Sequence, residues 1–387
     1  MEDVRRMGKL SIKERIMYRF VFSENTVYKH WYSRFLFFGV DLDRIRRVVQ
    51  RIDNFYEWCD EWSKEGAKAE ALAEGALSRG DTFSARRFFH EAAGCYHIGQ
   101  HVYFFDAKRK NEAQEKIREN YRKAIDLYDE EQRPIRVEIP FRGTVIPGYL
   151  RLGRELERPL VLWIDGGDNL KEVENHYAGN LLLDASLNCF AFDGPGQGEM
   201  WKSMKLIPDY EKVVSAIIDW FEKNNDYKID LSRIGTCGLS LGGYLSPRSA
   251  AFDKRISCAV GNGGFGYLNL KTKPKGINPM IVREFLYMTG FESVEEAGAG
   301  WGEIDIKEAP RLDRPLLFIQ GGKDKVIPNP KEQADYIVDW AVGEKELKYY
   351  PDGEHCCGNY MDEVIPLIID WLQKHLNKNP KRIRPSI

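Results

Sequence analysis

Long apolar runs are missing from this sequence of 387 residues. No window approaches the roughly 20 consecutive apolar residues of a membrane span. The N-terminal stretch MEDVRRMGKLSIKERIMYRFVF has neither an uninterrupted apolar segment nor a small-residue cleavage site. We therefore expect no membrane partner and no secretory leader.

An excess of charge of one sign is missing as well. Lys and Arg number 57, Asp and Glu number 59, and the net charge of -2 gives no electrostatic reason to expect a nucleic acid as partner. The seven cysteines are scattered apart from the adjacent Cys356 and Cys357. Their spacing matches neither a disulfide framework nor a CxxC metal site, so a reducing, cytoplasmic setting is the expectation.

Two kinds of pattern divide the chain. Residues 1–133 are rich in Ala, Glu, Lys and Arg, with apolar residues three and four apart, which predicts an all-helical N-terminal domain. Pro134 ends this pattern, and residues 134–387 alternate short apolar runs with amphipathic segments. Such alternation predicts an α/β fold, a mostly parallel sheet flanked by helices. A helical insertion is expected at about 265–309.

Most of the predicted strands end at glycine-rich turns. IRVEIP and TVIPGYLRL are expected to form a strand pair. PLVLWID (159–165) and NCFAFD (188–193) are typical of buried parallel strands. Four further strands are predicted in RIGTCG, RISCAVGN, RPLLFIQG and LKYYPDG.

The motif Gly238-Leu-Ser240-Leu-Gly242 lies between a predicted strand and a predicted helix. GxSxG at this place is typical of a tight turn that exposes a nucleophilic serine. The next amide, that of Leu241, would stand at a helix N-terminus, where it can donate to an oxyanion. A bare GxSxG also occurs by chance, so the motif needs partners elsewhere in the chain.

A serine nucleophile needs a base, and the base needs an orienting acid. Asp324 in GGKDKVIP and His355 in DGEHCCGN follow two successive predicted strands. Taken singly, Asp324 could be a helix cap and His355 a turn residue. Taken in the order Ser, Asp, His at the carboxyl ends of strands, they predict a catalytic triad.

A second oxyanion donor is expected in the loop Asp165-Gly-Gly-Asp-Asn. Gly167 is the predicted amide, with Asp168 as the alternative. His97 and His101 are four residues apart and could line a substrate pocket, but ordinary packing is the competing interpretation. Neither an HExxH glutamate nor an evident third ligand accompanies them, so no metal is expected. DGPGQGE lacks the ending of a P-loop and GNGGFG the spacing of a dinucleotide motif, so no cofactor is expected.

Together, IDGGDNLKE, FDGPGQGEM and CGLSLGGYLSPRSAA resemble the α/β-hydrolase superfamily. Within it, the chain is similar to the group with a helical N-terminal cap domain that includes 2,6-dihydropseudooxynicotine hydrolase and fungal hydrolases that shorten polyketide chains. The resemblance covers roughly residues 85–375. It implies the α/β-hydrolase fold, a homodimer, and cleavage of a carbon–carbon bond beside a ketone by Ser240, Asp324 and His355.

The expected function is therefore a serine hydrolase that cleaves a C–C bond in a small β-diketone or polyketide-like substrate. A carboxylesterase or lactonase is the first alternative, because the same residues serve esters. A binding module on a hydrolase scaffold is the alternative from another class. The intact Ser, Asp and His argue against that last interpretation.

Overall fold

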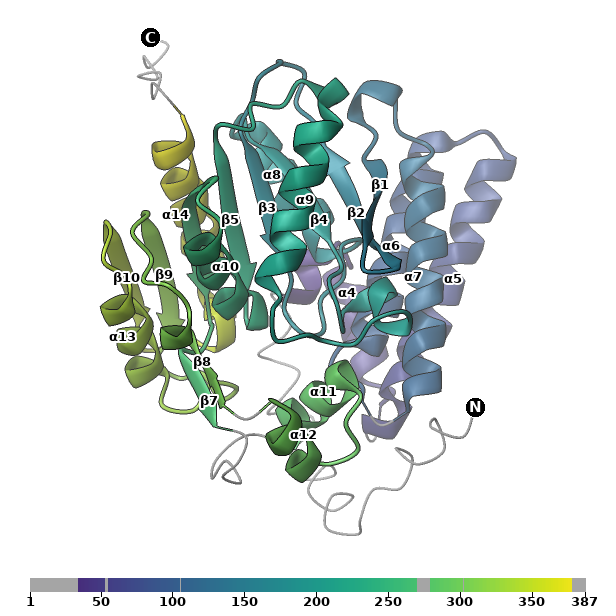
Figure 1. The fold of residues 1–387 in the computed structure, drawn as a ribbon. Helices are drawn as coiled ribbons and strands as arrows, with labels where there is room; N and C mark the ends of the chain where they lie inside the picture. Colours follow the sequence, from purple (N-terminus) through teal and green to yellow (C-terminus); the bar gives the residue numbers. More distant parts are fainter. Residues whose placement is uncertain (1–33, 53–54, 105, 270–278, 302, 378–387) are drawn as a thin grey trace.

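A mostly parallel sheet of eight strands forms the centre of the chain (Figure 1). The computed structural model describes residues 34–52, 55–104, 106–269, 279–301 and 303–377. The strand order is β1-β2-β4-β3-β5-β6-β9-β10; β2 runs antiparallel to β1 and β4, and the other neighbours are parallel. The predicted α/β fold is confirmed. The strands are β1 (Ile135–Phe141), β2 (Thr144–Arg151), β3 (Leu160–Ile164), β4 (Asn188–Phe192), β5 (Ile234–Leu239), β6 (Ile256–Asn262), β9 (Leu316–Gly321) and β10 (Lys345–Tyr350).

Helices cover both faces of this sheet, which explains why its inner strands are continuous apolar runs. Along β3, Leu162 and Ile164 join the core on one face, whereas Val161 and Trp163 join the core on the other, because side chains alternate along a strand. The first face packs against α9 (Glu211–Lys223), α10 (Leu241–Phe252) and α13 (Pro330–Trp340). The second packs against α8 (Glu174–Asp184) and α14 (Met361–Leu376).

The N-terminal helices lie beside β1 and β2 (Figure 1). They are α4 (Leu42–Val49), α5 (Trp58–Ser78), α6 (Thr82–Gln100) and α7 (Ala107–Ile125). Trp58 and Trp62 of α5 share an apolar core with Tyr149 of β2 and Leu170 of the loop after β3. The helical region is therefore packed directly onto β2 and onto the loop after β3.

The interval 265–309 contains more than the helices expected there. The helices α11 (Pro279–Thr289) and α12 (Val294–Trp301) are present, but the interval also contains β7 (Tyr267–Asn269) and β8 (Glu303–Asp305), which pair with each other in an antiparallel ladder. In Figure 1 this unit lies beyond one end of the main sheet. Among the described residues, no helix combines the length and apolar character needed to cross a membrane.

Candidate active site

Ser240 lies at the sharp turn between β5 and α10. Its φ of 57° and ψ of -117° fall in a sparsely populated region, which costs on the order of 1–3 kcal/mol. A Cβ atom at Gly238 would lie 2.0 Å from the Gly242 carbonyl oxygen, and one at Gly242 would lie 2.0 Å from the Ile164 carbonyl oxygen. The two glycines thus allow the backbone contacts that hold the strained serine at the end of the sheet.

One hydrogen-bonded chain joins Ser240, His355 and Asp324. The Ser240 Oγ is 2.9 Å from His355 Nε2, and His355 Nδ1 is 2.8 Å from Asp324 Oδ2. Asp324 follows β9 and His355 follows β10, two parallel neighbours whose carboxyl ends meet at the same edge of the sheet. The topology therefore brings together three residues that are up to 115 positions apart.

The electrostatics around His355 stabilise the imidazolium that forms when its ring accepts a proton. Burial disfavours the charged Asp324, but His355 and the amides of Val326 and Ile327, which donate to Oδ1, hold the pKa of Asp324 below its usual value. Burial also disfavours a charged His355, yet the Asp324 carboxylate raises the pKa of His355 well above its usual value. An imidazole so placed can accept a proton from the serine hydroxyl and retain it while charge develops elsewhere.

Two backbone amides near Ser240 are suited to an anionic oxygen. Leu241 is the first residue of α10, and its N–H points out of a helix N-terminus. The backbone of Gly166 passes close to the serine, since a Cβ there would lie 3.2 Å from Ser240 Cβ. Within the described part of the chain, neither the Leu241 nor the Gly167 N–H donates to another protein group. Both are thus available to a ligand.

The loop after β3, which carries Gly166 and Gly167, is held from the sheet side by Gln197. The Gln197 amide donates to the carbonyls of Asp165 (2.8 Å) and Gly166 (2.9 Å). Its own Oε1 accepts from Tyr210 Oη at 2.8 Å, which fixes its orientation. The glutamine of DGPGQGE, expected only to belong to a tight turn, is therefore a support of the loop.

From the other side, the same loop is held by the helical region. The Asp168 carboxylate accepts from the Lys110 ammonium of α7 and from the Val102 amide. Lys110 also donates to the carbonyl of Gln100 at 2.7 Å and to its Oε1 at 2.6 Å. Lys110 is only 1% exposed and Gln100 is fully buried, so this buried network joins α6, α7 and the loop.

His97 and His101 lie beside this network. His97 is buried at the end of α6, with Nδ1 3.3 Å from Gln100 Nε2, and its ring meets Phe38 edge-on. His101 follows α6, and its Nδ1 is 3.5 Å from the Asp168 carboxylate. Burial lowers the pKa of both well below its usual value, so both imidazoles are neutral. Neither lines the cavity next to Ser240, and their contact with substrate stays a prediction.

Three acidic residues with the spacing of metal ligands meet on the far side of the loop: Glu172, Asp193 and Glu199. The Lys171 ammonium lies among them, 2.7 Å from Glu172, 2.7 Å from Asp193 and 2.9 Å from Glu199. The lysine charge therefore occupies the place that a cation would take. This cluster secures the loop, and its chemistry gives no reason to propose an ion.

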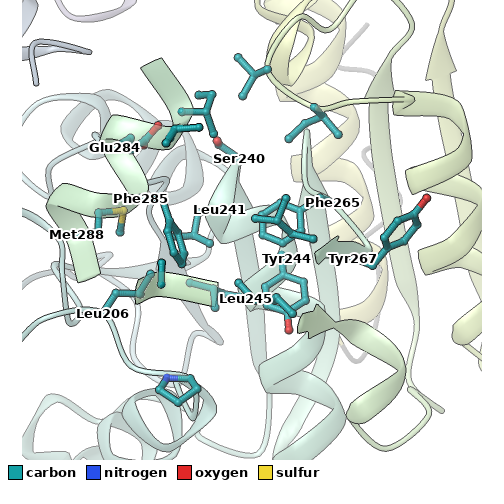
Figure 2. A pocket seen from close by; sticks show the side chains of 18 of the residues that line it. Leu206, Ser240, Leu241, Tyr244, Leu245, Phe265, Tyr267, Glu284, Phe285 and Met288 are labelled. Carbon is teal, nitrogen blue, oxygen red and sulfur yellow. The ribbon is translucent and has the colours of Figure 1, made fainter. Parts of the chain in front are cut away.

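A largely apolar cavity of about 200 Å³ opens next to Ser240. Glu284 of α11 stands in its wall, and Figure 2 shows its carboxyl and the serine hydroxyl near each other at one end. A Cβ atom at Gly167 would lie 2.0 Å from Glu284 Oε1, so the carboxyl touches the loop of the proposed oxyanion donor. Removal from water and the nearby Asp168 raise the pKa of Glu284 to about 7.

Sequence reasoning missed Glu284 and Lys110. Glu284 belongs to VREFLYM, an ordinary helical pattern, and Lys110 belongs to a segment dense in charged residues. Nothing in the neighbouring sequence distinguishes Glu284 or Lys110 from a solvent-exposed side chain. Only the three-dimensional packing of α7 and α11 on the loop after β3 shows that Lys110 is buried and that Glu284 is half-buried in the cavity wall.

The sheet order and the serine at the turn after β5, together with the N-terminal helices, define an α/β-hydrolase fold with an N-terminal helical region, and the chain is an α/β-fold hydrolase. It is 29% identical over 337 residues to 2,6-dihydropseudooxynicotine hydrolase of Paenarthrobacter nicotinovorans, covering 85% of this chain and 87% of that relative. The crystal structure of 2,6-dihydroxy-pseudo-oxynicotine hydrolase is similar over 92% of this chain and 98% of the chain in that crystal structure, with a TM-score of 0.79 and 27% sequence identity.

A fungal relative is similar over a shorter stretch. The hydrolyase poxO of Penicillium oxalicum is 32% identical over 221 residues, which is 54% of this chain and 52% of the relative. The chain thus spans about half the length of this fungal protein. No family model matches the sequence.

Proposed function

We propose that this protein is a serine hydrolase that cleaves a carbon–carbon bond next to a ketone, with Ser240 as nucleophile, His355 as base and Asp324 as its orienting acid. The observation that carries the proposal is the hydrogen-bonded chain of these three residues, which ends with Ser240 in the cavity wall. Similarity to 2,6-dihydropseudooxynicotine hydrolase over 85% of the chain supports the reaction class.

In the first half of the proposed reaction, Ser240 attacks the ketone carbonyl while His355 takes the hydroxyl proton. The Leu241 and Gly167 amides bind the resulting oxyanion, each contributing very roughly 3 kcal/mol. As the carbonyl re-forms, the bond to the α-carbon breaks and its electron pair leaves as an enolate. The proton that His355 took from Ser240 completes the leaving product, either directly or by way of Glu284, which gives its own proton to the enolate and takes the proton of His355 in return, so that His355 is neutral again.

In the second half, water releases the acyl group from Ser240. His355 removes a proton from the attacking water, and the ester bond to Ser240 breaks as the serine regains its proton. The products are a carboxylic acid and a ketone. Glu284 supports C–C cleavage in particular, because a carbon leaving group needs a proton donor and this carboxyl remains protonated up to about pH 7.

The experiment that tests the proposal compares a panel of 1,3-diketones with simple p-nitrophenyl esters. We expect diketone cleavage, labelling by a fluorophosphonate, and a loss of at least about a thousandfold in turnover in Ser240→Ala. Ser246→Ala is the matched control, because Ser246 lies on the same helix but contacts Thr236 instead of His355.

Two other outcomes would identify the alternatives. Fast ester turnover with intact diketones would show a carboxylesterase. A protein that neither turns over any substrate nor reacts with the fluorophosphonate would be a binding module. Retention of turnover in Ser240→Ala would exclude the proposed nucleophile.

A further inference from the structure

The cavity next to Ser240 continues along one face of α10. Tyr244 and Arg248 follow Ser240 at intervals of four residues, and all three line the same cavity. Residues four apart lie on the same side of a helix, and eight residues correspond to a rise of about 12 Å. The cavity therefore runs from the nucleophile to a point that a chain of several carbon atoms can reach.

The walls between these two ends are apolar and partly flat. The rings of Tyr244 and Phe265 stack with centroids 5.0 Å apart and an interplanar angle of 8°. Figure 2 shows Tyr244 and Leu245 lining the cavity away from Glu284, and Leu206 and Phe285 contribute further apolar surface. This passage suits an aliphatic or unsaturated chain, since it offers little to satisfy a polar group midway.

Arg248 provides a polar group at the distal end. Its side chain is only 12% exposed; Nε donates to Glu211 at 3.1 Å and Nη1 donates to Tyr244 Oη at 3.3 Å. A guanidinium carries five N–H donors. These two contacts hold Arg248 in place, and the guanidinium keeps further N–H donors that can bind a ligand. Within the described part of the chain, Arg248 is the only cationic residue that lines the cavity.

The charge around Arg248 is already balanced. Glu211, itself 7% exposed, neutralises the guanidinium, and Glu308 also lines the cavity. A carboxylate brought to this end would meet a neutral ion pair and a second acidic group. A neutral oxygen acceptor would gain a hydrogen bond from the guanidinium without adding a negative charge.

We propose that Arg248 forms a distal subsite for a neutral oxygen acceptor, such as a ketone or hydroxyl group, about 12 Å from the carbonyl that Ser240 attacks. The substrate class is then an oxygenated chain of polyketide type, and chains that end in a carboxylate are disfavoured. This inference rests on the proposed function, because it places the scissile carbonyl at Ser240.

The test uses three p-nitrophenyl esters of equal chain length that end in a methyl, a methyl ketone or a carboxylate group. We expect the keto-ended ester to show a kcat/KM about tenfold above that of the methyl-ended ester, as one hydrogen bond to a charged donor provides. The carboxylate-ended ester should be no better than the methyl-ended one. Binding of the same three esters to Ser240→Ala, measured by calorimetry, gives a second readout that needs no turnover.

Two variants separate the subsite from general damage. Arg248→Met should abolish the roughly tenfold keto-over-methyl ratio, whereas Arg255→Met, which removes an arginine paired with Asp253 near the end of α10, should keep it. Glu211→Gln leaves Arg248 uncompensated and should shift the preference toward the carboxylate-ended ester. That shift distinguishes an electrostatic subsite from a packing effect, because a neutral amide of equal size replaces the carboxylate.

Equal kcat/KM and equal affinity for the keto-ended and methyl-ended esters would overturn the subsite. So would an Arg248→Met variant with an unchanged ratio. Failure of the proposed function has a different signature: either rapid turnover of esters with intact diketones, or no turnover of any ester or diketone and no reaction with a fluorophosphonate. In either case the affinities measured by calorimetry still show whether the site at Arg248 binds the keto-ended ester more tightly than the methyl-ended ester.

Discussion

Glu284 illustrates, at the scale of a single residue, how the site controls charge next to the reacting carbonyl. Its carboxyl lies against Gly167, whose amide is a proposed oxyanion donor. An ionised carboxylate here would repel a developing oxyanion, whereas the neutral acid does not. Removal from water and the neighbouring Asp168 raise the pKa of Glu284 to about 7, and Lys110 and His355 limit the rise.

We predict that kcat/KM has a bell-shaped dependence on pH. His355 must lose a proton to act as a base and Glu284 must keep its proton, and since the pKa of His355 is raised well above its usual value while that of Glu284 is about 7, the two limbs belong to this pair of groups together. Above about pH 7 the Glu284 carboxyl ionises, so activity should fall. In Glu284→Gln, which cannot ionise, the alkaline limb should disappear while the acid limb remains. Rates over pH 5 to 10 with one diketone measure both limbs.

A second variant in the cavity wall distinguishes the loss of an ionisable group from a change in packing. Met288→Leu changes the cavity shape but removes no ionisable group, so its alkaline limb should match that of the unaltered protein. An alkaline limb that persists unchanged in Glu284→Gln would assign it to another group.

At the same scale, some residues of the candidate site leave a pattern in the sequence and others leave none. Ser240 could be identified because its strained turn needs Gly238 and Gly242, and that requirement leaves a pattern in the chain. Glu284 leaves no such pattern. Its role depends on how α11 lies over the loop after β3, and that is set by contacts between distant segments.

At the scale of elements, the loop after β3 matters because two parts of the molecule hold it. Gln197 fixes its carbonyls from the sheet side, and Lys110 fixes Asp168 from α7. Such opposed contacts leave the Gly167 amide in a defined orientation. The helical region therefore contributes to the geometry of the site as well as covering it.

We predict that Lys110→Met lowers the free energy of unfolding by about 3–5 kcal/mol, because it leaves Asp168 as a buried and uncompensated charge. It should also lower kcat more than it changes KM, because the loop that carries Gly167 becomes less fixed. Adding Asp168→Asn should restore most of the stability, since both charges are then gone. Urea unfolding and steady-state kinetics measure these effects.

The same helix offers a matched control. Lys116 is 44% exposed and pairs with Glu119 of α7 and Glu70 of α5, so Lys116→Met should cost less than about 1 kcal/mol. If Lys110→Met were as stable as this control, the pair with Asp168 would have no structural importance.

At the scale of the whole molecule, the sequence predicts the main strands of the sheet but does not predict how the helices pack against it. The apolar runs that became β3, β4, β5 and β9 are buried on both faces, so they stand out in the sequence. The strand pair β7–β8 was missed because each strand has three residues, too short for a period to show. How the helices dock on the sheet depends on side chains with no shared pattern.

One junction between the helical region and the sheet is a buried cluster of aromatic and imidazole rings. His90 of α6 and His176 of α8 have ring centroids 4.3 Å apart, and the Tyr128 hydroxyl is 3.2 Å from Nε2 of each. Arg151 of β2 donates to Tyr121 at 2.5 Å beside them. Burial, reinforced by Arg151 and Arg86, lowers the pKa of His90 to about 3, and that of His176 is also well below its usual value.

We predict that this junction weakens the protein in acid. Between about pH 6.5 and pH 3 the unfolded chain binds a proton at His90 and the folded chain does not, so the free energy of unfolding falls as the pH falls. Each such histidine contributes about 1.4 kcal/mol per pH unit. Asp165, whose pKa burial raises, acts in the opposite direction, so the test compares slopes between variants.

His90→Gln should reduce the dependence of the unfolding free energy on pH by about 1.4 kcal/mol per unit between pH 4 and pH 6, measured by urea unfolding at half-unit intervals. Tyr128→Phe is the control, because it removes hydrogen bonds to both imidazoles but no group that titrates in this range. Its stability should shift by a similar amount at every pH. A His90→Gln variant with the slope of the unaltered protein would show that His90 is protonated in the folded state, and that the junction is not the acid-sensitive part of the molecule.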